Sequence, residues 1–170
     1  MSAPVFVDTN VLLYAIDEAE PRKHRAALEW RAHLWRSRRG RLSYQVLQEF
    51  YVQALRKNPK RAAVARAEVR DLLAWDPIPI DGGVVEWAWD LQDRYSLSFW
   101  DALIVAAAHA AECGYLLTED LSHGQVLDGV LVVSPFEASP ETLDNLRRPR
   151  YSSATTSRAP GRIRGGSSHE

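Results

Sequence analysis

Short apolar runs alternate with longer amphipathic segments along most of this chain, and this alternation limits its possible folds more than any other feature. The apolar runs have the length of buried strands and span 4–8, 41–44, 115–118 and 130–136. The longer segments repeat apolar residues at helical spacing and span 26–39, 45–57, 62–75, 83–96 and 98–113. Strands that alternate with helices of this length are typical of a parallel sheet with helices on both faces, so we expect an α/β fold.

Local features indicate where some of these elements end and which helix is central. Gly40 and Gly114 directly follow the helical segments 26–39 and 98–113 and are expected to terminate them. The segment 77–80, Pro-Ile-Pro-Ile, is expected to be extended and at most a short edge strand, because proline cannot donate to a ladder. The segment 98–113 is apolar on all sides, which predicts a central helix buried on two sides.

The composition predicts one folded domain followed by a basic tail. A chain of 170 residues is long enough for one domain with a proper core, which we place at 1–146. Residues 147–170 hold six arginines and one glutamate among serine, glycine and proline, and this composition predicts disorder. Contact with nucleic acid and a solvated extension without a specific role are both compatible with this tail.

The sequence also predicts a cytoplasmic protein that does not associate with membranes. No apolar run approaches the roughly 20 residues that a membrane-spanning helix needs. The N-terminus lacks the basic and apolar regions of a secretory signal. Cys113 is the single cysteine, so the chain can form no intrachain disulfide, and we expect this thiol to be an inert part of the core.

Acidic side chains stand at or near the carboxyl ends of the predicted strands, where ligands bind in open α/β sheets. They are Asp8 at the end of the first strand, Glu49 in the helix 45–57, Asp101 at the start of the helix 98–113, and Asp120 after the strand 115–118. Each acid alone could be a helix cap, a turn former or a solvated border residue. Together they would repel one another unless a cation neutralised them, and a hard divalent ion such as Mg²⁺ or Mn²⁺ is the usual answer.

Other site chemistries find less support in the sequence. The chain has no Gly-x-Gly-x-x-Gly or P-loop motif, and one cysteine with five scattered histidines does not suit zinc. Ser43 and Ser98 lack a His–Asp pair at recognisable spacing, and His123 is the histidine nearest the acids in sequence. Two basic stretches, 36–41 and 56–61, are expected to lie around the pocket of acids and attract a phosphate backbone, or else to be solvated helix ends.

Five sequence blocks in a fixed order resemble those of PIN-domain ribonucleases, and most closely those of VapC-like toxins from bacterial toxin–antitoxin pairs. The blocks lie between residues 4 and 137 and read VFVDTNVLLYA, SYQVLQEFY, YSLSFWDALIVAAA, LLTEDLSHGQ and VLVVSPF. The resemblance implies a three-layer α/β/α sandwich with a central parallel sheet. It also implies a quartet of catalytic acids, which would be Asp8, Glu49, Asp101 and Asp120.

The resemblance extends to three further positions. Asn10, in Asp8-Thr9-Asn10, is implied to brace its loop rather than to bind metal, and Thr118 matches the small hydroxyl residue before the last acid. The last block commonly reads Asn-Pro-Phe, whereas this chain has Ser134-Pro135-Phe136. This departure lies outside the quartet.

The expected function is therefore that of a Mg²⁺-dependent endoribonuclease, with Mn²⁺ as a possible substitute. Asp8 and Asp101 are expected to be the main metal ligands, with Glu49 and Asp120 completing the pocket and acting on the attacking water. The family implies a homodimer and an antitoxin that covers the acids, with an arginine facing the carboxylates. Two alternatives stay open: a catalytically silent PIN-fold module that binds RNA or protein, and a metal-dependent phosphatase, against which Asn10 argues because such enzymes need an aspartate at that position.

Overall fold

The computed structural model describes residues 3–145, and their five strands form one mostly parallel sheet in the order β2-β1-β3-β5-β4. The strands are β1 (Val5–Val7), β2 (Gly40–Arg41), β3 (Tyr115–Leu117), β4 (Val126–Leu127) and β5 (Val130–Val133). The four predicted strands are confirmed; each is shorter than predicted, and β2 begins one residue earlier, at Gly40. β4 was not predicted and pairs antiparallel with β5, so the sheet is not purely parallel.

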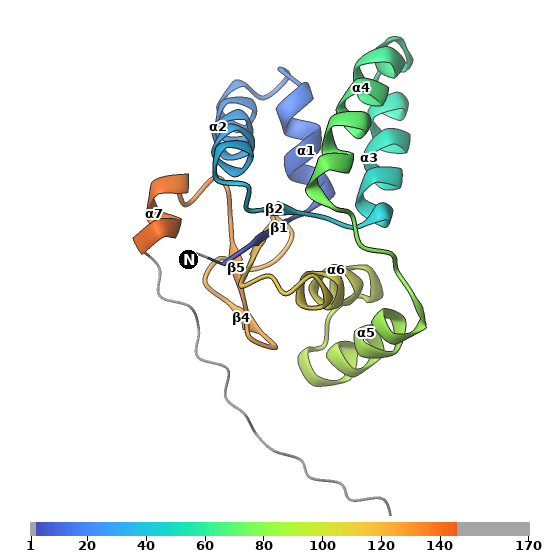
Figure 1. Cartoon of the computed structure of the whole chain (residues 1–170), viewed down its shortest axis with the longest axis vertical. Coiled ribbons are helices and arrows are strands. Elements are labelled where there is room, and N and C mark those ends of the chain that lie inside the picture. Colours follow the sequence, from blue (N-terminus) through green and yellow to red (C-terminus); the bar gives the residue numbers. More distant parts are fainter. Residues whose placement is uncertain (1–2, 146–170) are drawn as a thin grey trace, which may run out of the picture.

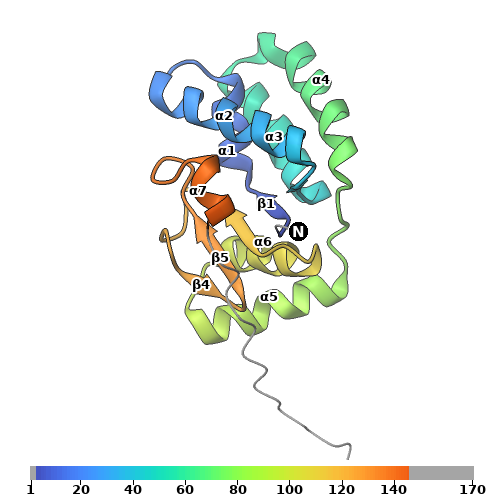
Figure 2. The same cartoon turned by 60° about the vertical axis from the view of Figure 1, so that its left-hand side comes forward.

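Helices cover both faces of this sheet, which confirms the predicted three-layer α/β/α sandwich. In Figures 1 and 2, α1 to α4 lie on one side of the sheet and α5 and α6 on the other. Their bounds are α1 (Thr9–Ile16), α2 (Pro21–Ser37), α3 (Tyr44–Lys57), α4 (Ala62–Leu72), α5 (Gly82–Tyr95) and α6 (Phe99–Ala110). The short α7 (Pro140–Asn145) packs beside α2 at the margin of the sheet.

The ends of the helices differ from the sequence-based expectation in instructive ways. The helix α1 was not predicted, α2 begins five residues before the predicted start, and 73–75 form a 3₁₀ turn after α4. Arg38, in the left-handed region with φ of 55°, caps α2 in place of Gly40. Gly40 instead lies in β2 against an indole, since a Cβ there would meet ring carbons of Trp75 at 2.6 Å.

Gly114 likewise does not cap α6. The helix ends at Ala110, and Glu112 takes the positive φ of 55° that the turn requires. Gly114 is needed for a close approach, because a Cβ there would lie 2.8 Å from the Cβ of Ala3. The Pro-rich segment 77–80 forms one isolated parallel bridge, Ser43 with Ile78, rather than a strand.

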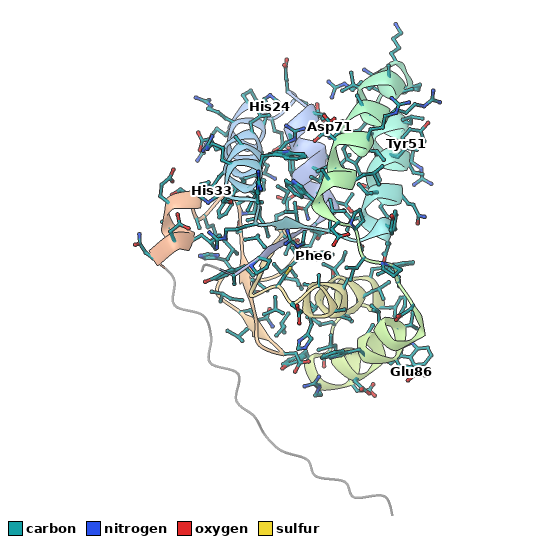
Figure 3. All side chains as sticks on the ribbon, in the orientation of Figure 1. Phe6, His24, His33, Tyr51, Asp71 and Glu86 are labelled. Carbon is teal, nitrogen blue, oxygen red and sulfur yellow. The ribbon has the colours of Figure 1, made fainter. Side chains whose placement is uncertain are left out.

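The core lies between the sheet and both helical layers. Every residue from Ala102 to Ala108 in α6 is buried, which confirms the prediction of a helix buried on two sides. Phe6 of β1 is fully buried and lies near the centre of the molecule in Figure 3. Cys113 is also buried, and this burial raises the pKa of its thiol to about 12, so the thiol is protonated and unreactive at neutral pH.

The helices that the structure describes do not combine the length and the apolar character that crossing a membrane requires. The predicted disordered tail, 147–170, lies outside the described residues.

Candidate active site

The carboxyl ends of three parallel strands are aligned, and this alignment places the first acid. Val7 of β1 pairs with Leu117 of β3, which in turn pairs with Val133 of β5. The next residues along these strands, Asp8, Thr118 and Ser134, therefore emerge at one edge of the sheet. Asp8 N donates to Leu117 O at 3.0 Å, which holds the end of β1 against β3.

Asp8 has a different role for each of its carboxylate oxygens. Oδ1 accepts a hydrogen bond from Thr9 N at 2.7 Å, so Asp8 caps α1. A helix cap was one of the structural roles that the sequence left open for this acid. Oδ2 accepts from Thr118 Oγ1 at 2.8 Å and from Asn10 Nδ2 at 3.3 Å. The capping role and a site role are thus compatible, because capping occupies one oxygen only.

Asn10 and Thr118 connect Asp8 to the last acid of the predicted quartet. Asn10 Nδ2 donates to Thr118 Oγ1 at 3.1 Å and to Asp120 Oδ2 at 3.0 Å. Thr118 Oγ1 also accepts from Asp120 N at 3.1 Å. Asn10 therefore braces the loop after β3, which is the role that the resemblance implied, and its own Oδ1 is buried without a hydrogen-bond partner among the described residues.

Glu49 reaches the same edge from α3. Ser43 caps this helix by accepting from Val46 N, and Glu49 lies at the border of the buried face, half-buried as its place in the sequence predicted. Glu49 Oε2 accepts from Thr9 Oγ1 at 3.2 Å, and Oε1 accepts from Gln45 Nε2 at 2.8 Å. Thr9 thus joins Glu49 to the residue next to Asp8.

Three of the four acids share one electrostatic environment. Burial raises the pKa of Asp8 from 3.8 to about 6; hydrogen bonds from Thr118 and Thr9 oppose this rise, and the charges of Asp120 and Glu49 add to it. Asp8 is only 7% exposed, so solvent screens these charges poorly. The structure therefore brings Asp8, Glu49 and Asp120 together.

Asp101 stands apart from this network. It lies in the first turn of α6, where Ser98 Oγ accepts from Asp101 N at 3.1 Å and donates to Asp101 Oδ2 at 2.7 Å. Among the described residues, the hydrogen bonds that link the other three acids do not reach Asp101. Its neighbour Trp100, however, lines the same surface hollow as Glu49, so the start of α6 lies beside this part of α3.

Comparison with known proteins decides the family of this chain. The family model described as PIN domain matches residues 5–126, which include all four acids. The chain belongs to the PIN domain family. No curated protein matches it.

Solved structures similar to this PIN domain include three that each match about two thirds or more of the chain. A toxin–antitoxin complex from Klebsiella pneumoniae is 21% identical, with a TM-score of 0.55, over 77% of this chain and 97% of that chain. VapC20 of Mycobacterium tuberculosis, a toxin that cleaves the sarcin–ricin loop, is 26% identical, with a TM-score of 0.53, over 66% of this chain and 86% of that chain. VapBC2 from Rickettsia felis, bound to a promoter DNA fragment, is 17% identical, with a TM-score of 0.52, over 75% of this chain and 96% of that chain. The resemblance to VapC-like PIN proteins is therefore confirmed.

The donor atoms at the acidic edge of this PIN domain suit a hard cation. Carboxylate, hydroxyl and amide oxygens are what Mg²⁺ and Mn²⁺ prefer, and the repulsion that helps to raise the pKa of Asp8 is what a cation would relieve. Asn10 Oδ1 adds a buried acceptor without a partner among the described residues. The described part of the chain contains no group of three or more His, Cys, Asp or Glu side chains already arranged around a metal position. The case for a cation at this edge therefore rests on the chemistry of the donor atoms and not on an arranged ligand geometry.

The predicted minor candidates have structural roles in this PIN domain. His123 Nδ1 accepts from Ser134 N at 3.1 Å and ties the loop after β3 to the end of β5. Ser43 and Ser98 are the N-caps of α3 and α6, which explains both serines without a nucleophilic role.

The basic stretches differ in their position relative to the acids. Stretch 36–41 lies at the amino ends of the strands, since Gly40 pairs with Val5 at the start of β1, and the prediction that it surrounds the pocket is wrong. Its Arg39 is buried and donates to Ala3 O at 2.9 Å and Asp144 at 2.7 Å.

Stretch 56–61 lies at the end of α3 and is partly committed to ion pairs. Lys57 pairs with Asp17 at 2.6 Å, and Arg61 lies 3.8 Å from the same carboxylate. Arg56 and Lys60 are exposed and have no ion pair within residues 3–145, so these two charges are free to meet a phosphate.

One cluster beside the site was missed from the sequence. Glu119, next to the last acid, accepts from Tyr14 OH at 2.8 Å and from Lys23 Nζ at 2.9 Å. Lys23 also lies over the rings of Tyr14 and Phe136, at 4.8 and 5.2 Å from their centroids. The cluster fixes the loop after β3 to α1 and α2. Its members lie far apart in the chain, and the only local signal was a second acid beside Asp120.

Proposed function

We propose that this PIN domain is a divalent-metal-dependent endoribonuclease and the toxin of a toxin–antitoxin pair, acting in the cytoplasm. The observation that carries the proposal is the placement of Asp8, a buried carboxylate with its pKa raised to about 6 and with Glu49 and Asp120 acting on its charge. A chain that holds three repelling acids at the carboxyl edge of its sheet destabilises itself unless a cation binds there. The cleavage of RNA by VapC20 supports RNA as the substrate.

In this proposal each acid has a defined part. Asp8 and Asp101, at the start of α6, would hold Mg²⁺, with Mn²⁺ as a substitute. A bound ion would lower the pKa of water and neutralise charge on the phosphate in the transition state. Asp120, which is exposed and oriented by Asn10, would take the proton of the attacking water, while Glu49 would orient that water.

The test is cleavage of total bacterial RNA by the purified chain in Mg²⁺, in Mn²⁺ and in EDTA, with mapping of the new RNA ends. We expect discrete cuts with either metal and none in EDTA. Glu49→Gln and Asp120→Asn should each lower the cleavage rate by about 10²-fold or more. Glu86→Gln is the matched control, because Glu86 is exposed on α5, on the far helical layer (Figure 3). RNA binding without cleavage would favour the catalytically silent module, and hydrolysis of small phosphate esters alone would favour the phosphatase.

The proposal includes an antitoxin partner and a homodimer. Similarity to a Klebsiella pneumoniae toxin–antitoxin complex and to VapBC2 supports the first. We expect the product of a neighbouring gene to inhibit cleavage by placing an arginine against the carboxylates. Light scattering at micromolar concentration should give twice the mass of the chain, and the mass of a monomer would contradict the dimer.

A further inference from the structure

An exposed tryptophan stands directly beside the acidic site. Trp100 is 62% exposed and precedes Asp101 in the first turn of α6. The ring of Phe99 packs against it with centroids 5.4 Å apart in an edge-on arrangement, which limits the orientations of the indole. A single exposed aromatic is ordinary, so its neighbours decide what it means.

Trp100 faces a hollow whose other wall is one stripe of α3. The hollow has a volume of about 590 Å³ and is lined by Gln48, Glu49, Val52, Gln53, Arg56 and Trp100. The five α3 residues recur at helical spacing, so they form a continuous stripe from the acidic site toward the end of the helix. Glu49 belongs both to this hollow and to the hydrogen-bonded acids. The hollow therefore begins at the acidic site.

The chemistry of the lining matches a nucleotide rather than an apolar protein segment. The indole offers a π-face, the two glutamine side chains offer amide donors and acceptors, and Arg56 offers a cation. Arg56 has no ion pair among the described residues and lies about 10 Å along α3 from Glu49. At that separation it reaches a phosphate next to the scissile one.

We propose that Trp100 and this stripe of α3 form a nucleobase-stacking subsite, in which the indole stacks on an unpaired base of the RNA substrate and Arg56 contacts an adjacent phosphate. The subsite rests on the proposed ribonuclease function and specifies it, because a base must leave its helical stack to enter. The substrate class is therefore single-stranded RNA or a loop.

The test compares two probes of equal charge, a 12-nucleotide oligoadenylate and a 12-unit chain of abasic ribose phosphates. Stacking tolerates any base, so no specific sequence is needed. Dissociation constants are measured by fluorescence anisotropy in EDTA, where cleavage does not interfere. We expect the wild type to prefer oligoadenylate, and Trp100→Ala to lose that preference, with oligoadenylate binding about 5- to 150-fold weaker and abasic binding unchanged.

Four further variants separate stacking from other effects. Trp100→Phe should keep most of the preference and Trp100→Leu should not, because leucine is apolar but has no π-face. Arg56→Gln should weaken both probes equally and reduce the salt dependence. Trp89→Ala is the matched control, since Trp89 is 53% exposed on α5 and does not line the hollow, and it should bind both probes as the wild type does.

Cleavage of RNA in Mg²⁺ by the same variants tests the stacking subsite separately from the proposed ribonuclease function. We expect Trp100→Ala to raise KM and to leave kcat within about 3-fold of the wild type. If the wild type cleaves RNA but Trp100→Ala binds oligoadenylate equally well, or Trp100→Leu restores binding, the stacking subsite is refuted and the ribonuclease is not. If Trp100→Ala keeps its binding of oligoadenylate and loses only the binding of a protein partner, the surface is a protein interface and the stacking subsite is refuted. If the wild type neither binds nor cleaves RNA, both proposals fail.

Discussion

Replacing Asp8 by asparagine should change how the stability of the protein depends on pH. The carboxyl has a pKa of 3.8 when unfolded and about 6 when folded. The folded state therefore holds the proton more tightly, and the wild type loses unfolding free energy as the pH rises from about 4 to above 6. A difference of about two pKa units, at 1.36 kcal/mol each, makes this loss about 3 kcal/mol. Asparagine does not titrate, so the variant lacks this loss.

The pH dependence is more informative than either stability alone. Asparagine can keep the cap on α1 by accepting from Thr9 N, but its Nδ2 replaces an oxygen that accepts from Thr118 and Asn10. That change costs stability by an amount that does not vary with pH. We therefore expect Asp8→Asn to gain about 3 kcal/mol relative to the wild type between pH 3 and pH 8, whatever its offset at pH 3.

Urea unfolding in EDTA at several pH values measures this difference. Asp93→Asn is the control for the loss of a carboxylate, since Asp93 is exposed on α5. Mg²⁺ at 100 times its dissociation constant should then stabilise the wild type at pH 8 by about 2.7 kcal/mol and leave Asp8→Asn nearly unchanged. A difference that is flat with pH, or that favours the wild type at high pH, would mean that the charged form of Asp8 is stabilising as a cap, and would refute the argument.

Three other changes have defined outcomes. Lys23→Met should free Glu119 and the loop after β3, so that cleavage falls several-fold while circular dichroism is unchanged; an unchanged rate would show that the loop needs no such anchor. Glu68→Ala should lower the unfolding free energy in urea by about 2–3 kcal/mol, because it strands Arg31, which now donates at 2.6 and 2.7 Å; a loss below about 1 kcal/mol would contradict this reading. Deletion of 147–170 should leave the Tm within a few degrees, because that composition buries little apolar surface, and weaker RNA binding at equal Tm would give this segment an electrostatic role.

The fold was largely predictable because its signals are local. Apolar runs at strand length, and apolar residues at the helical spacing that predicted α5 and α6, can be read within a few residues of sequence. The helix α1 was missed because its eight residues continue the apolar run of β1. Over so short a segment, the spacing of apolar residues does not distinguish a helix from a strand. The strand β4 was missed because two residues carry no periodicity, and only its antiparallel pairing with β5 defines it.

The site was predictable where it depends on strand ends, and not where it depends on contacts between distant segments. Asp8 and Asp120 follow neighbouring parallel strands, so topology alone brings them together. The Thr9–Glu49 hydrogen bond spans 40 residues of sequence, and no local pattern announces it. The basic stretch 36–41 was wrongly placed around the pocket because its position in the sequence does not tell at which end of the strands it lies.

The borders of the sheet bear on how this protein avoids aggregation. Both edge strands, β2 and β4, are only two residues long, and Ile78 N and O bond to Leu42 O and Tyr44 N just beyond β2. An incoming strand therefore finds too few free backbone groups to extend the sheet, which is the usual route to edge-to-edge aggregation. Within residues 3–145, the sheet therefore offers no edge long enough for copies of the chain to polymerise through it.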